Sequence, residues 1–304
     1  MTTSLPAAIF AVLLTMAAVS SAPAHAQPSA PPDLRGYTAV PPDGFMTGRE
    51  AYFQTPDGLL CAVLPDQGRA GCDGRLPGTT GGANEIVLAA DVNARGLRTT
   101  ASPGFVRPLG GAAPVLREGQ KLAVGDYECG VGPGPSTSCT KGSPPTQWLV
   151  VSPTGTGIGP ATTGLPDGFP DPNDYVVGDE SYIVGVGAKN MFPVFTVEGG
   201  LTCSIVVYSG GEIGCDGPLP GVPGGENEVY TQLPGATGVR HTDTPRFATP
   251  AYPGPVRQLP VGHRVNGIGS TCMAIAGGVA CYGTLAGAAQ GFEVSPEGVS
   301  TFGG

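Results

Sequence analysis

Residues 72–78 read CDGRLPG, and residues 215–221 read CDGPLPG. The two stretches lie 143 positions apart, and the other cysteines repeat at the same interval to within one residue. The first half of the chain holds Cys61, Cys72, Cys129 and Cys139, and the second half holds Cys203, Cys215, Cys272 and Cys281. The interval predicts that one cysteine-containing unit occurs twice.

The repetition extends well beyond the cysteines. Residues 81–86 read GGANEI and return as GGENEV at 224–229, and residues 151–155 read VSPTG and return as VSPEG at 294–298. We therefore predict two tandem homologous domains, at 33–160 and 165–304, joined by a short linker at 161–164. A length of 304 residues also favours two domains, because single cores usually divide beyond about 250 residues.

The eight cysteines are predicted to form disulfides. The count is even, and the spacings of nine to twelve residues differ from the short spacing of zinc ligands. Pairing within each half leaves three arrangements per domain, and bridges between neighbouring strands of a hairpin fit the flanking apolar runs. The favoured pairs are Cys61–Cys72, Cys129–Cys139, Cys203–Cys215 and Cys272–Cys281.

The N-terminus has the pattern of a secretory signal peptide at residues 1–26. Residues 7–19 are apolar and too few to span a membrane, and Ala24-His25-Ala26 offers a small-x-small cleavage site. A Pro-rich linker at 27–32 follows. No later segment approaches eighteen unbroken apolar residues, so we expect no transmembrane segment after signal removal, and a secreted protein that is extracellular or associated with the cell envelope.

Composition favours an all-β protein. The 51 glycines and 33 prolines lie between short runs rich in Val, Ile, Leu and Thr, while 40% of residues are hydrophobic and only 13% are charged. No stretch after residue 26 has the apolar period of a helix. We expect each domain to be a small β-sandwich or β-barrel with two disulfides. The predicted strands are 51–54, 59–64, 85–89, 121–124, 127–129, 148–151, 181–186, 194–197, 201–208, 228–232, 264–268, 271–275, 279–282 and 291–294.

The net charge of −9 argues against a nucleic-acid partner, which needs Lys and Arg against phosphate. Residues 161–304 contain five basic and thirteen acidic residues, whereas 27–160 contain ten and eleven. This imbalance has two interpretations: solubility, or an acidic face that binds a cation or a basic partner.

Polar residues that recur in both halves are the candidate ligand-binding residues. They are Asn84, Glu85 and Arg98 in the first half, with Asn227, Glu228 and Arg240 at the matching positions in the second half. A carboxylate and a guanidinium can hold a ligand, and a Glu can act as an acid or base. The structural alternative is a cross-strand Glu–Arg pair beside a turn Asn, and it is favoured.

Other motifs give weak support for chemistry. His241 lies two residues before Asp243, but no G-x-S-x-G motif supplies a nucleophile for it. The acidic stretch 167–180 lacks EF-hand spacing, so an acidic inter-domain segment is favoured over a cation site. The glycine-rich stretches 130–134 and 155–160 lack the Lys-Ser/Thr of a phosphate loop and are predicted to be turns or linker. We assign no catalytic residue, no metal ligand and no cofactor.

Two motifs resemble a domain family of exported actinobacterial proteins, especially mycobacterial ones. Residues 53–61, FQTPDGLLC, fit the opening pattern F-x-[ST]-P-x-G-x-x-C of that family, and residues 278–281 and 291–295, GVAC and GFEVS, fit its closing pattern. The second half lacks the Pro of the opening pattern, and the first half lacks the Gly-Val before Cys139. The resemblance implies an exported envelope protein of unknown function and carries over no catalytic residues.

These observations favour an exported, non-enzymatic binding or structural module of the cell envelope, whose partner is an unidentified envelope component or extracellular protein. Two alternatives remain at this point: a secreted hydrolase with a site in the second half, and a calcium-dependent adhesive or sensory domain.

Overall fold

The structure, a computed structural model, describes residues 30–91, 94–108, 111–185, 191–206, 211–248 and 255–303. It is nearly all β, as the sequence predicted, and the described residues contain no α-helix. The short helical turns are of the 3₁₀ type: η1 (Pro42–Gly44), η2 (Pro65–Gln67), η3 (Pro172–Asp174) and η4 (Glu180–Tyr182).

Two sheets are built from the first half of the chain. One contains β1 (Thr38–Ala39), β8 (Gln120–Val124), β9 (Tyr127–Gly132), β10 (Ser136–Lys141), β11 (Gln147–Ser152) and β12 (Gly155–Gly159), in that order. The other follows the chain through β2 (Met46–Thr47), β3 (Glu50–Gln54), β4 (Leu60–Leu64), β5 (Arg69–Asp73), β6 (Glu85–Ala89) and β7 (Gly96–Arg98). Their apolar faces enclose one core, which is the arrangement of a sandwich.

The strands of the second half are connected in the same order. One sheet runs through β14 (Ile183–Gly185), β15 (Met191–Thr196), β16 (Thr202–Val206), β17 (Glu212–Asp216), β18 (Glu228–Gln232) and β19 (Thr237–Arg240). The facing strands are β13 (Val176–Val177), β20 (His263–Gly267), β21 (Ser270–Ile275), β22 (Gly278–Leu285), β23 (Ala288–Ser295) and β24 (Gly298–Phe302).

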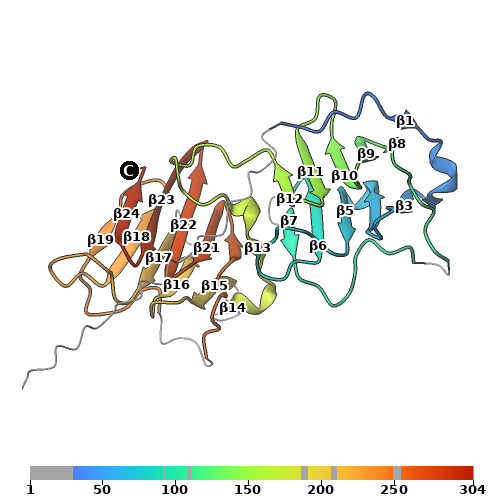
Figure 1. Cartoon of the computed structure of the whole chain (residues 1–304). Helices are drawn as coiled ribbons and strands as arrows, with labels where there is room; N and C mark the ends of the chain where they lie inside the picture. The colour runs from blue at the N-terminus through green and yellow to red at the C-terminus, as the bar shows by residue number, and fades with distance from the viewer. Residues whose placement is uncertain are drawn as a thin grey trace, which may run out of the picture.

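Strand β13 joins the two halves into a continuous sheet of twelve strands (Figure 1). It lies parallel to β7 on one side and parallel to β20 on the other, with Val176 opposite both Leu97 and His263. Val176 is 1% exposed and packs in the core of the first half. The chain that leaves the first half therefore completes that half's core before it begins the second.

All four predicted disulfides are confirmed. Each joins directly opposed residues of neighbouring antiparallel strands, with Cα–Cα distances of 4.0 to 4.1 Å. All eight cysteines are 0% exposed. The two bridges of each half lie in the same core, one on each of the facing sheets. They are thus part of the apolar packing as well as covalent links.

The interpretation of residues 130–134 and 155–160 as turns or linker was wrong for most of these positions. Gly130 and Gly132 lie in β9, and residues 155–159 form β12. Glycine is tolerated in these strands because aromatic rings cover the backbone: a Cβ on Gly130 would lie 2.8 Å from Cδ2 of Tyr37, and one on Gly159 would lie 2.1 Å from Cε2 of Trp148.

Candidate functional site

The repeated polar residues form a ladder on the outer face of each half. In the first half Asp73 on β5 lies opposite Glu85 on β6, which lies opposite Arg98 on β7. Side chains alternate between the two faces of a strand, so Asp73 points outward because its neighbour Cys72 points into the core. The second half repeats the arrangement with Asp216, Glu228 and Arg240.

Asn84 and Asn227 fix the loop that follows the last strand of each ladder. The Nδ2 of Asn84 donates to the carbonyl of Thr100, and the N–H of Thr100 donates back to Oδ1, both at 2.8 Å. Asn227 makes the same two bonds with Thr242, both at 2.9 Å. Each asparagine therefore acts as a clamp on the chain of its own half.

The two aspartates secure the far end of the same loop. Oδ2 of Asp73 accepts the N–H of Phe105 at 2.6 Å, and Oδ2 of Asp216 accepts the N–H of Phe247 at 2.6 Å. Both rings are 1% exposed. Residues 100–105 read TASPGF and residues 242–247 read TDTPRF, so the captured loop has a shared pattern that the sequence analysis did not use.

A glycine of the sheet makes room for each captured ring. A Cβ on Gly71 would lie 2.4 Å from Cζ of Phe105, and one on Gly214 would lie 2.2 Å from Cζ of Phe247. The shared sequence Gly-Cys-Asp-Gly, at 71–74 and 214–217, now has a physical meaning. Its first glycine receives the ring, its cysteine enters the core, and its aspartate binds the loop.

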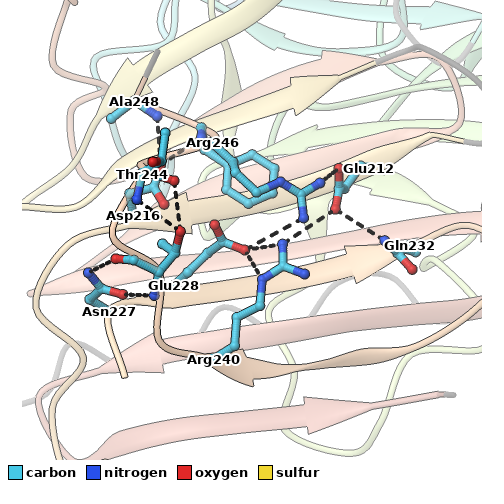
Figure 2. A network of polar contacts seen from close by, with 11 residues as sticks. Glu212, Asp216, Asn227, Glu228, Gln232, Arg240, Thr244, Arg246 and Ala248 are labelled. Carbon is cyan, nitrogen blue, oxygen red and sulfur yellow. Dashed lines mark hydrogen bonds and ion pairs between the residues drawn. The ribbon is translucent and has the colours of Figure 1, made fainter. Parts of the chain in front are cut away.

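The halves differ in the charges around this loop. In the first half Nε of Arg98 lies 4.0 Å from Glu85, and Arg69 of β5 lies over the ring of Phe105. The second half has Glu212 at the strand position of Arg69, and its cation comes from the loop as Arg246. Figure 2 shows Arg240 and Arg246 pointing toward Glu228 and Glu212. Nε of Arg240 donates to Glu228 at 2.5 Å.

Burial shifts the acid–base behaviour of both glutamates. The side chain of Glu85 is 8% exposed and that of Glu228 is 0% exposed. Desolvation raises the pKa of each above its usual value, and the negative charge of the neighbouring aspartate raises it further. The facing arginine opposes this shift in each half. Burial beside an aspartate thus favours the protonated form of each glutamate more than exposure to water would.

The structure brings the six predicted residues together as two separate clusters, one per half. Every member is engaged with its own sheet or loop, which accords with the structural interpretation of the pattern. Sequence patterns had not pointed to the aspartates, the phenylalanines, Glu212 or Arg246 as members of these clusters. The two aspartates could have been found because each directly follows a repeated Cys. The two phenylalanines could have been found because each stands two residues after a repeated Pro.

Among the described residues, the ring of His241 hydrogen-bonds to Gly225 and Asp243 and to no serine, threonine or cysteine. Its side chain is 61% exposed, and its ring nitrogens contact the carbonyl of Gly225 at 2.9 Å and Asp243 at 3.2 Å. The bond to Gly225 and, in second place, the contact with Asp243 raise the pKa of His241. These partners stabilise the protonated ring, whereas a general base must be neutral to accept a proton.

Two aspartates of the acidic stretch 167–180 accept hydrogen bonds from nearby backbone N–H groups. Asp171 accepts the N–H of Asn173 at 2.9 Å and caps η3, and Asp179 accepts the N–H of Ser181 at 2.9 Å. Within the part of the chain that the structure describes, no group of three or more His, Cys, Asp and Glu side chains is arranged to hold a metal ion.

No helix among the described residues has the length and apolar character needed to cross a membrane. The sequence matches no known family model, and neither a curated protein nor a solved structure is significantly similar to the chain.

Proposed function

We propose that the chain is an exported, non-enzymatic binding or structural module of the cell envelope, produced by duplication of one disulfide-linked β-sandwich. The observation that carries this proposal is the use of the recurring polar residues. Asn84 and Asn227 clamp loops, and Glu228 is buried against Arg240. Side chains that could perform chemistry are engaged in holding the outer loops in place.

Export is supported by the four disulfides, because such bonds persist in oxidising compartments. It is also supported by the signal-peptide pattern of residues 1–26, which lie outside the described residues, and by the resemblance of residues 53–61 to exported actinobacterial proteins. The repeated sequence and the equal strand order of the two halves support duplication. The proposed partner is an envelope component or an extracellular protein.

Two experiments test the proposal. Cell fractionation with thiol titration of the native chain should find the protein outside the cytoplasm with no free thiol. A panel of esterase, peptidase and glycosidase substrates should show no turnover by the purified chain. Turnover that disappears in Glu228→Gln or His241→Ala, with folding retained, would replace the binding module by a hydrolase. A rise in melting temperature with calcium over EDTA would instead favour the calcium-dependent adhesive module.

A further inference from the structure

A cavity of about 180 Å³ with several polar side chains in its wall lies where the two halves meet. One wall of the cavity is the outer face of β20, β21 and β22. Residues in and near η3 line a second wall, and Arg95, in the turn before β7, lines the cavity from the first half. The residues that matter for its chemistry are Arg95, Arg264, Asn173, Asn266, Thr271 and Tyr282.

Two arginines line this cavity without a paired carboxylate. Arg264 is only 4% exposed, and its Nη2 donates to the carbonyl of Arg95 at 2.7 Å. The buried Nε atoms of Arg264 and Arg95 have no hydrogen-bond partner. Within the described chain, no carboxylate lies within 4.0 Å of either guanidinium. A buried charge without a counter-charge is costly, so the site favours an anion.

At the matching position, the first half has a carboxylate that the second half lacks. Lys121 is the second residue of β8, as Arg264 is of β20, and its Nζ pairs with Glu128 at 2.9 Å. Glu128 is the second residue of β9, and the second residue of β21 is Thr271. The second half therefore keeps the cation, buries it, and has a hydroxyl in place of the carboxylate.

The nearby acidic groups do not balance the positive charge of Arg95 and Arg264. Tyr282 and the carboxylate of Asp171 both favour the charged forms of the two arginines, and Asp171 also accepts the N–H of Asn173. Burial lowers the pKa of Arg264 to about 10, so the side chain stays cationic at neutral pH. One carboxylate thus faces two guanidinium groups.

The neutral groups of the cavity suit an oxygen-rich ligand. Nδ2 of Asn266 is a buried donor without a partner, and the hydroxyls of Thr271 and Tyr282 lie on the same wall. Liquid water takes about 30 Å³ per molecule, so the cavity has room for a tetrahedral oxyanion and a few waters but excludes a large ligand. Guanidinium groups bind such oxyanions through charge-assisted hydrogen bonds.

We propose that this cavity binds a small oxyanion, the phosphate, sulfate or carboxylate group of a ligand, between Arg95 of the first half and Arg264 of the second. This inference deepens the proposed binding role and rests on it for its biological meaning. Since the ligand contacts both halves, its binding stabilises their junction.

The test is thermal unfolding of the full mature chain in inorganic phosphate, sodium sulfate or sodium acetate, each compared with sodium chloride at equal ionic strength. The site predicts a saturable rise in melting temperature with at least one oxyanion, with calorimetry giving about one anion per chain. The three salts distinguish a tetrahedral anion from a carboxylate.

Thr271→Glu is the deciding variant, because it restores the carboxylate that the first half has in Glu128. It should raise the melting temperature in chloride and abolish the saturable response to oxyanions. Arg264→Gln should abolish the same response to oxyanions, provided that this variant folds. Arg49→Gln is the matched control, since its side chain is 82% exposed, and it should respond like wild type.

A response equal to that in chloride, or one that persists unchanged in Thr271→Glu, overturns the proposed site. Sulfate also stabilises proteins nonspecifically, and that effect would persist in every variant. The substrate panel is independent of this titration. Turnover of a substrate would overturn the proposed non-enzymatic role without affecting the evidence for the oxyanion site. Failure to bind an oxyanion would overturn the site without affecting the proposed non-enzymatic role.

Discussion

The ring of Phe105 packs directly on the backbone of Gly71, and the loop that supplies the ring hydrogen-bonds to Asp73 two residues further along the same strand. Gly214, Phe247 and Asp216 repeat this arrangement. The outer face of each half therefore has one defined covering loop.

Gly71→Ala and Gly214→Ala are expected to displace the covering loops. The new methyl group would overlap the ring, and overpacking of this kind costs about 1–3 kcal/mol. Urea unfolding should show the loss of stability, and hydrogen exchange should rise at 100–105 or 242–247 respectively. Gly36→Ala is the control, because a Cβ there meets nothing within 4 Å. Equal stability of all three variants would contradict the packing.

Ionisation of the Glu228 carboxyl should lower the stability of the protein as pH rises above about 4.5. Its pKa is raised in the folded state, so the folded chain holds the proton more tightly than the unfolded chain does. The stabilisation is complete below the unfolded-state pKa and is lost as pH rises through the folded-state pKa. Stability curves from pH 4 to 7 should fall less steeply for Glu228→Gln than for wild type.

The two substitutions at Glu228 should also differ at neutral pH. A glutamine amide can donate to Asp216 and still accept from Arg240, so Glu228→Gln should stay within about 1 kcal/mol of wild type. Glu228→Ala leaves the arginine without that acceptor and should lose about 3 kcal/mol. Similar losses in both variants would argue against a stabilising contact between Arg240 and the side chain at position 228.

Removal of one cross-strand bridge should weaken the half that contains it. Each disulfide closes a loop of 9 to 12 residues, which corresponds to about 3 kcal/mol in the chain-entropy treatment. Cys129→Ala combined with Cys139→Ala should lower the urea midpoint, with hydrogen exchange rising first in β8 to β11. An unchanged midpoint would show that core packing alone maintains this sheet.

Gly96→Ala should loosen the junction of the two halves. Gly96 has a φ of +145°, which side chains rarely adopt, and a Cβ there would lie 2.6 Å from Nη2 of Arg264 and 2.8 Å from Cγ2 of Val177. Exchange should increase in β7 and β13 while β9 to β11 remain protected. Gly44→Ala, where a Cβ meets nothing within 4 Å, is the control.

Local sequence signals identified many of the elements. Short runs rich in Val, Ile, Leu and Thr located 85–89 and 228–232 with their observed bounds. The repeat narrowed the disulfide pairings to three per half, and the apolar runs beside the cysteines favoured the observed pairs. Among the strands that were not predicted, β5, β12 and β17 contain glycines or charged residues, because their outer faces are covered by rings, loops and ion pairs. Such coverage comes from distant segments, so no local pattern reveals it.

The candidate site was only partly predictable for the same reason. Pairing of Glu with Arg across strands followed from the repeat, but the capture of Phe105 by Asp73 depends on a loop 32 residues away. The cavity between Arg95 and Arg264 joins residues 169 positions apart in different halves. The sequence contained the difference between Glu128 and Thr271, but its meaning required the strand register.

The position of β13 has a consequence for how such a chain could be inherited or divided. A gene fragment ending before Val176 would encode a first half with an exposed edge at β7 and a gap in its apolar interior, and exposed edges recruit other chains. A fragment beginning after Val177 would leave β20 equally unprotected. Neither half could therefore be removed without exposing a strand edge of the other half to pairing with other chains.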